Sequence, residues 1–219
     1  VAAYGFDETT GTQVLDTSGR GNHGTLSNAT RTTQAKFGRA LSFNGTNSLV
    51  TVPDSATLDL SGRLTLAAWV YPTSWASGWK SLIMKERTGG LAYTLSANSD
   101  TGRPSSTVRI ASADRSLTAG SHRPSTTWMH LATTYDGATQ RLFVNGTQVG
   151  SRAQTGTLEV SANPLRIGGN TVWAGQYFQG LIDEVRLYSR ALSQSEVAAV
   201  AQEPVVKPAS VCASPCSLW

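Results

Sequence analysis

Short segments in which apolar and polar residues alternate recur along residues 1 to about 200, and turn residues separate them. Two such segments, in residues 140–152, flank Asn145-Gly146. This dipeptide is a strong signal for a tight hairpin because both positions tolerate positive φ. Residues 64–71 are apolar on both faces, as in a central strand covered by a second layer, and residues 36–43 are another candidate strand. Roughly a dozen strands and almost no helix predict an all-β, two-sheet antiparallel sandwich.

Residues 178–197 join a strand to the start of a helix. The first half alternates at period two, and Ser193 with Glu196 forms an S-x-x-E capping box that predicts a short helix over residues 194–201. Asp183 lies in the row of this strand that is otherwise apolar. A carboxylate in that place must be solvated, paired with a cation or bound to a metal.

Length and composition favour one domain with a tail. The chain has 219 residues, and a β-sandwich of this size is common as a single unit. We predict one domain over residues 1–203. Residues 204–219 contain prolines and both cysteines, Cys212 and Cys216, and we expect them to form a Pro-rich linker or tail that leads toward a following module.

Charge and hydropathy argue against two classes of partner. The net charge of +4 comes from 18 basic and 14 acidic residues without any Lys/Arg run, which argues against nucleic-acid binding. No segment approaches the ~20 consecutive apolar residues of a membrane span, so we expect no membrane insertion.

Five stretches in order carry a resemblance to a known family: residues 4–26, 39–55, 64–72, 128–150 and 178–197. Together they closely resemble the bacterial laminin-G-like domains of the concanavalin A-like lectin/glucanase superfamily. The resemblance implies a jelly roll over about residues 1–203. It also implies an accessory module of a secreted or cell-surface protein, often beside glycan-active enzymes, and many such domains hold a calcium ion.

The candidate metal ligands fall in two groups. The loop over residues 16–24 is rich in Gly, Asn and Asp, and Asp16 and Asn22 could supply the oxygen ligands that calcium prefers. The resemblance further implies a structural calcium that ties the first strand and an early hairpin to the last strand, through Asp7, Gly45 and Asp183. The alternative is that Asp16 caps its own turn, and that Asp183 pairs with an Arg or accepts backbone N–H groups.

No catalytic or zinc motif is present. Related jelly-roll glycanases carry E-x-D-x-x-E on one strand, whereas Asp183 and Glu184 are adjacent and therefore point to opposite faces. No G-x-S-x-G elbow and no zinc spacing occur. We predict that the domain is not an enzyme, and we read His130 as a packed, hydrogen-bonded core histidine.

Loop aromatics are the candidate ligand-binding residues. They lack the period-two pattern of core positions, and sugar sites combine aromatic faces with a few polar groups. The basic residues Lys80, Arg103 and Arg123 could assist an acidic glycan. The alternative is that the rings seal the ends of the sandwich. The candidates are Trp75, Trp79, Trp173, Tyr177 and Asn170.

The sequence thus predicts a monomeric, non-catalytic, calcium-stabilised module that binds a polysaccharide or other glycan. It would lie outside the cell or on its surface, beside neighbouring domains of the same chain. The alternative function is a structural or adhesive spacer that contacts protein and binds no glycan.

Overall fold

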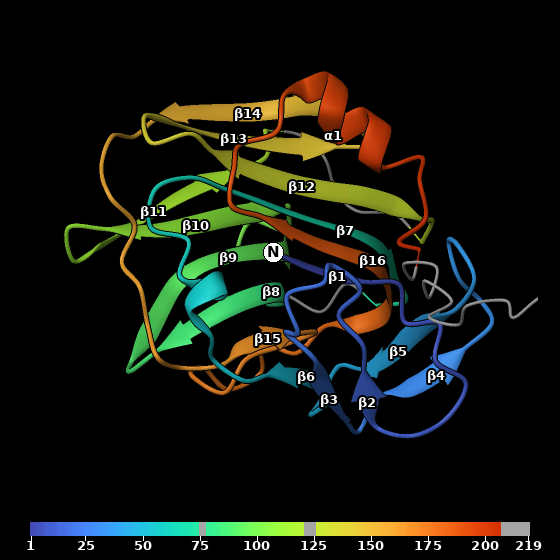
Figure 1. The fold of residues 1–219 in the computed structure, drawn as a ribbon. Coiled ribbons are helices and arrows are strands. Elements are labelled where there is room, and N and C mark those ends of the chain that lie inside the picture. The colour runs from blue at the N-terminus through green and yellow to red at the C-terminus, as the bar shows by residue number, and fades with distance from the viewer. Residues whose placement is uncertain (75–77, 121–125, 207–219) are drawn as a thin grey trace, which may run out of the picture.

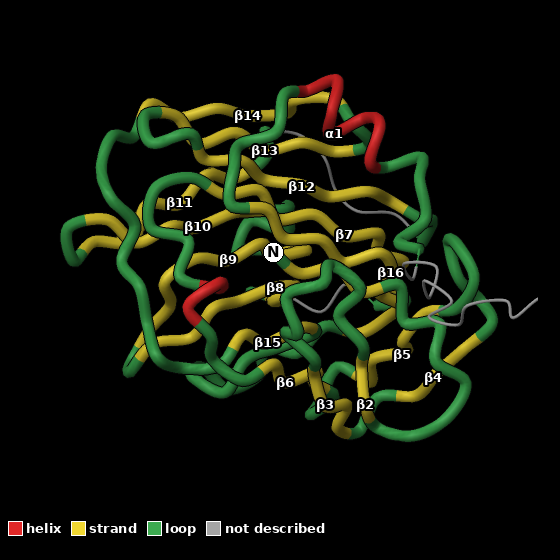
Figure 2. Tube along the Cα trace, in the orientation of Figure 1, coloured by secondary structure: helices red, strands yellow, loops and turns green. Residues whose placement is uncertain are grey.

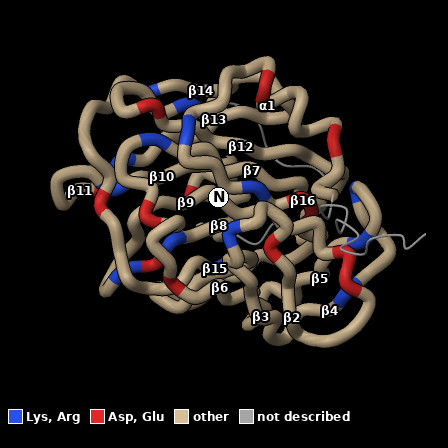
Figure 3. The backbone as a smooth tube through the Cα atoms, in the orientation of Figure 1, with Lys and Arg blue, Asp and Glu red and all other residues tan. Residues whose placement is uncertain are grey.

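The computed structural model describes residues 1–74, 78–120 and 126–206. These residues form two antiparallel sheets that face each other, with one short α-helix on the outside (Figures 1 and 2). The predicted all-β sandwich is confirmed. Lys/Arg and Asp/Glu positions are intermingled along the chain (Figure 3).

The first sheet has eight strands within the described residues, and β1 pairs with β16 beside the main path. Its order is β14 (Thr147–Ala153), β13 (Thr139–Val144), β12 (Met129–Tyr135), β7 (Leu64–Pro72), β16 (Gln179–Tyr188), β5 (Ala40–Asn44) and β4 (Thr30–Thr32), with β1 (Ala2–Tyr4) on β16.

The second sheet also has eight strands in the part of the chain that is described. Its order is β11 (Ala113–Thr118), β10 (Ser105–Ile110), β9 (Gly90–Asn98), β8 (Lys80–Arg87), β15 (Leu165–Ile167), β6 (Leu49–Val52), β3 (Gly24–Ser27) and β2 (Gln13–Val14). A 3₁₀ turn, η1 (Ala56–Leu58), follows β6.

The core lies between the two sheets and is mainly aliphatic. Polar side chains from both sheets meet within it. The Thr133 hydroxyl donates to Ser106 Oγ at 2.8 Å, and Gln140 Nε2 donates to the same oxygen at 2.7 Å. These buried groups are tolerated because they bond to one another. The predicted hairpin at Asn145-Gly146 joins β13 to β14, and both turn residues have positive φ.

Helix α1 (Gln194–Val200) begins at the predicted capping box: Ser193 accepts from Glu196 N–H, and the Glu196 carboxylate accepts from Ser193 N–H. Leu192 and Val197 pack on Ala67, Ala132 and Phe143 of the first sheet. The helix therefore covers the outer face of that sheet. Within the described ranges, no helix has the length and apolar character of a membrane span.

Packed chain continues beyond residue 203. Val205 is buried, and its N–H donates to the Glu184 carboxylate. The Arg186 guanidinium donates to the carbonyls of Val200 and Glu203. We call these contacts the C-terminal clasp. Cys212 and Cys216 lie outside the described residues.

Candidate ligand-binding site

The outer face of strands β8 to β11 carries a row of small hydroxyl side chains. Thr94 of β9, Thr107 of β10 and Ser116 of β11 alternate with residues that point into the core, because successive strand residues face opposite sides. Thr107 and Ser116 hydroxyls lie 2.8 Å apart, and the Thr94 hydroxyl donates to the Ile83 carbonyl at 2.8 Å. Each oxygen still has lone pairs that can accept a ligand's hydroxyl.

Two indole side chains, Trp79 and Trp173, line a pocket of about 260 Å³ together with these hydroxyls. Trp79 precedes β8, and Trp173 lies in the loop over residues 168–178. Both rings are half-buried, and Trp79 Nε1 donates to Asp100 Oδ2 at 2.7 Å. The other lining residues are Ser81, Met84, Thr94, Leu91, Ser96, Thr107, Asp114, Ser116 and Gln176.

Asn170 belongs to the same loop and is fully buried. Its Oδ1 accepts the N–H groups of Val172 at 3.1 Å and Trp173 at 2.8 Å, and its Nδ2 donates to Ser81 Oγ and Gln176 Oε1. All of its polar atoms are therefore used within the protein. Asn170 was predicted to contact ligand, but the structure makes it an internal brace of the loop.

The remaining predicted ligand-binding residues do not all line the same pocket. Trp79 and Trp173 share the pocket. Tyr177 does not, because it lines a separate hollow together with Lys80, and Lys80 Nζ is bound to the Gly175 carbonyl at 2.7 Å. Trp75 lies outside the described residues.

Asp16 and Asn22 belong to one turn, which is bonded to the first residues of the chain. Asp16 Oδ1 accepts the N–H groups of Ala3 and Ser18 at 2.9 Å, and its Oδ2 accepts Asn22 N–H at 3.0 Å. Burial raises the pKa of Asp16, but these hydrogen bonds outweigh it, so the pKa lies below its ordinary value. The geometry matches the alternative in which Asp16 caps its own turn.

Asp183 is fully buried and accepts three backbone N–H groups: Lys36 at 2.9 Å, Phe37 at 3.0 Å and Glu184 at 2.8 Å. Burial raises its pKa to about 7, and the bonds from Phe37 and Lys36 oppose the shift. Asp7 Oδ1 accepts Arg39 N–H at 2.9 Å. Asp7 and Asp183 thus hold the same segment, residues 36–39.

Gly45 lies away from both carboxylates. Its neighbour Asn44 pairs with Gln179, four positions before Asp183 on β16, and at about 3.3 Å per residue this is roughly 13 Å along the strand. The described residues contain no group of three or more His, Cys, Asp or Glu that could hold a metal ion. Asp7 and Asp183 thus come together at residues 36–39 without Gly45, and calcium binding stays a prediction.

Residues 44–198 match the family model described as the concanavalin A-like lectin/glucanases superfamily. The chain belongs to this superfamily. The resemblance drawn from the sequence motifs is thereby confirmed. Mouse pappalysin-1 is 31% identical over 110 residues, which cover 48% of this chain and 6% of pappalysin-1.

Solved structures share the fold of this superfamily member at low sequence identity. Domain 4 of AbnA, a GH43 extracellular arabinanase from Geobacillus stearothermophilus, in complex with arabinotriose, has a TM-score of 0.73 at 22% identity; the match covers 92% of this chain and 97% of that one. The binding domain of Paraclostridial Mosquitocidal Protein 1 has a TM-score of 0.71 at 17% identity, over 91% and 51% of the chains. The Botulinum neurotoxin serotype D ligand binding domain, in complex with N-acetylneuraminic acid, has 0.70 at 12%, over 92% and 50%.

Sequence reasoning missed the strand hydroxyls of this concanavalin A-like domain. A signal was present: Thr94 and Ser96, and likewise Ser105 and Thr107, occupy alternate positions of neighbouring strands. Small polar residues at period two indicate a face that neither joins the core nor carries long solvated side chains. Such a face leaves room for a ligand.

Proposed function

We propose that this domain is a non-catalytic carbohydrate-binding module that takes a sugar unit in the pocket of Trp79 and Trp173. The observation that carries the proposal is the shared pocket itself, which two indole side chains line together with a row of hydroxyls. Indole rings cover the apolar face of a sugar, and hydroxyls exchange hydrogen bonds with its rim.

The lining favours an uncharged sugar. Among the described residues that line the pocket, only Asp114 is ionisable, and it is paired with Arg109 at 2.7 Å. A ligand carboxylate or sulfate would be desolvated there without a cation to compensate it. Lys80 lines the other hollow, Arg103 lines neither of the two, and Arg123 lies outside the described residues. The acidic glycan considered from the sequence is thus disfavoured.

The similar structures support a binding role. Domain 4 of AbnA was solved with arabinotriose, a neutral oligosaccharide, and other matches are toxin binding domains. A retaining glycosidase needs two carboxyl groups about 5 Å apart, and the described lining residues supply one, which supports a non-catalytic role. We further propose that the domain is extracellular, because the arabinanase that contains the similar domain 4 is described as extracellular.

Calcium binding near Asp7 and Asp183 remains a prediction. What supports it is that Asp7 and Asp183 hold one segment, residues 36–39. What weighs against it is that backbone N–H groups already occupy both oxygens of Asp183. No binding step in this proposal depends on the ion.

Replacing Trp79 and Trp173 together by Ala tests the proposal. We expect at least a tenfold loss of affinity for neutral oligosaccharides in a glycan array and in affinity electrophoresis, since buried aromatic anchors dominate binding energies. The melting temperature should change little, because both rings are only half-buried. Trp128→Ala is the matched control, since Trp128 packs against Tyr71 and does not line the pocket. Unchanged retention of the double variant would refute the assignment. A wild-type protein that binds no glycan would favour the spacer function.

A further inference from the structure

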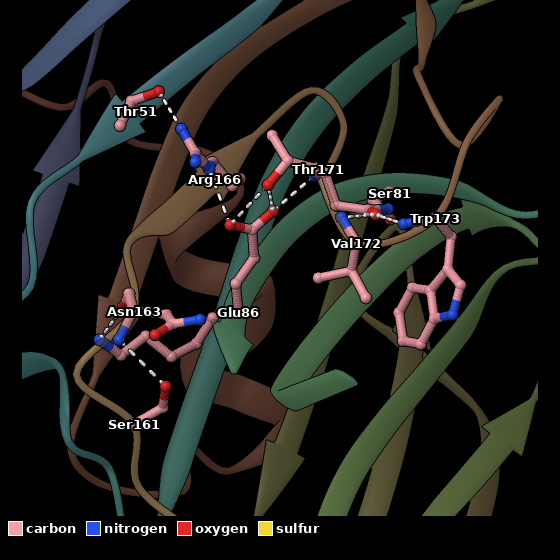
Figure 4. A network of polar contacts seen from close by, with 11 residues as sticks. Thr51, Ser81, Glu86, Ser161, Asn163, Arg166, Thr171, Val172 and Trp173 are labelled. Atoms are coloured by element: carbon pink, nitrogen blue, oxygen red, sulfur yellow. Dashed lines mark hydrogen bonds and ion pairs between the residues drawn. The ribbon is translucent and has the colours of Figure 1, made fainter. Parts of the chain in front are cut away.

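Glu86 is a buried carboxylate that does not line the pocket. It lies on β8, is 2% exposed, and accepts from Thr171 N–H at 2.5 Å and from the Thr171 hydroxyl at 3.0 Å. Its other oxygen accepts from Arg166 Nε at 3.0 Å (Figure 4). A buried carboxylate is tolerated only when such partners compensate its desolvation.

Glu86 and Asn170 act on consecutive residues of the loop. Glu86 takes the N–H of Thr171, and Asn170 takes the N–H groups of Val172 and Trp173. Three successive backbone N–H groups, ending at Trp173, are therefore held by buried side-chain oxygens. The two bonds to Asn170 are an Asx turn within the loop, whereas Glu86 holds the loop from strand β8, so the backbone that leads to the Trp173 ring is tied to the second sheet.

The contacts of Glu86 tie it to further strands of the second sheet. Arg166 of β15 pairs with Glu86 and also donates to the Thr51 hydroxyl of β6. The Glu86 backbone N–H donates to the Pro164 carbonyl at 3.1 Å. Three neighbouring strands thus hold the carboxylate in place (Figure 4). An anchor seated on rigid strands is the arrangement that pre-organises a binding residue.

We propose that Glu86 is a positioning residue that holds Trp173 in its binding geometry before ligand arrives. The inference rests on the proposed function, because it assigns a role in that same pocket. A pre-ordered ring loses little freedom on binding, whereas a loose one must be immobilised at a cost in affinity.

Glu86→Gln is the variant that tests the anchor. The amide replaces one acceptor oxygen with an N–H₂ donor, which then faces either Arg166 Nε or the Thr171 N–H. We expect the loop to loosen at Trp173 and the affinity to fall about three- to tenfold. Thr171→Val is a milder second variant, which removes only the hydroxyl contact, in case Glu86→Gln does not fold.

Glu184→Gln is the matched control. Glu184 is also a buried glutamate paired with an arginine, Arg186 at 3.0 Å, but it lies on β16 of the other sheet. Loss of a buried ion pair destabilises the fold in both variants. Only the Glu86 variant should disturb Trp173.

Two measurements test the inference. The first is ¹⁹F NMR of protein labelled with 5-fluorotryptophan, in which the Trp173→Phe variant assigns the Trp173 line. The second is titration with arabinotriose and a panel of neutral oligosaccharides. We expect the ligand-free Trp173 line to broaden or shift in Glu86→Gln and to stay in place in Glu184→Gln. An unchanged Trp173 line overturns the inference whether or not a glycan is known. A changed line with undiminished affinity for an oligosaccharide that binds the wild type also overturns it. A changed line in a protein whose wild type binds none of the sugars refutes the proposed function but supports the hold of Glu86 on Trp173.

Discussion

His130 is buried without a hydrogen bond on either ring nitrogen within the described residues. The ring packs against Trp69 with centroids 5.5 Å apart, while the backbone N–H of His130 donates to Asn145 Oδ1. Burial, reinforced by the nearby Arg186 charge, lowers its pKa to about 3. The packed histidine expected from strand periodicity is present, but the hydrogen-bonded ring is not.

This histidine should make stability depend on pH. Its folded pKa lies below the unfolded value of about 6.5, so the unfolded chain binds the extra proton between these values. The contribution is complete above pH 6.5 and declines as pH falls toward 3. His130→Leu removes this contribution. From pH 7 to pH 4 the free energy of unfolding of the wild type should therefore fall by about 3 kcal/mol relative to that of the variant.

Urea unfolding at several pH values measures that difference. Burial raises the pKa values of Asp183 and Glu184 to about 7, so the folded state gains stability from them as pH falls through 7. Both proteins share this opposite effect, which therefore cancels in the comparison. Parallel stability curves for the two proteins would contradict the assignment of a neutral, proton-excluding His130.

At the scale of elements, the loop over residues 168–178 is closed at its neck. Gly168 N–H donates to the Leu82 carbonyl, and Phe178 N–H donates to the Gly168 carbonyl, each at 2.9 Å. Gly168 has φ +85°, and a Cβ there would lie 2.0 Å from the Phe43 ring. The position thus requires glycine both for backbone conformation and for space.

Gly168→Ala should destabilise the domain by about 2 to 5 kcal/mol, which adds the strain of positive φ to the cost of displacing Phe43. Gly175→Ala in the same loop is the control, since its φ is +77° but no atom lies within 4 Å of the added Cβ. It should cost about 1 to 2 kcal/mol. Equal losses in thermal or urea unfolding would show that the contact with Phe43 is unimportant.

Local patterns predicted local structure well. The capping box located α1 to within a residue of its end, and Asn145-Gly146 located its hairpin. The candidate strand over residues 36–43 is different: β5 begins only at Ala40, because the N–H groups of Lys36 and Phe37 bond to Asp183 instead of to a neighbouring strand. That partner is more than a hundred positions away, and no local pattern encodes it.

The candidate site was predictable only in part for the same reason. Aromatics outside strand periodicity indicated Trp79 and Trp173, which meet in the pocket. Nothing in the sequence distinguished Tyr177, which lines the other hollow. The brace by Asn170 and the anchor by Glu86 are contacts between separate elements, so only the fold reveals them.

For the whole molecule, calcium binding has a direct thermodynamic test. An ion at about a hundred times its dissociation constant stabilises a fold by about 2.7 kcal/mol. If Asp183 contributes to a site, calcium in place of EDTA should raise the melting temperature of the wild type, and Asp183→Asn should remove that increase. Equal melting temperatures of the wild type in calcium and in EDTA would end the calcium prediction.

Both ends of the described domain are tied to the same strand. β1 pairs with β16 through Ala2 and Leu187, and the C-terminal clasp holds Val205 to Glu184, also on β16. The pocket floor belongs to the other sheet. A pulling force applied at residues 1 and 206 would therefore be borne by β16 and its clasp. Strands β8 to β11, which form the pocket floor, lie in the other sheet and outside this path of force.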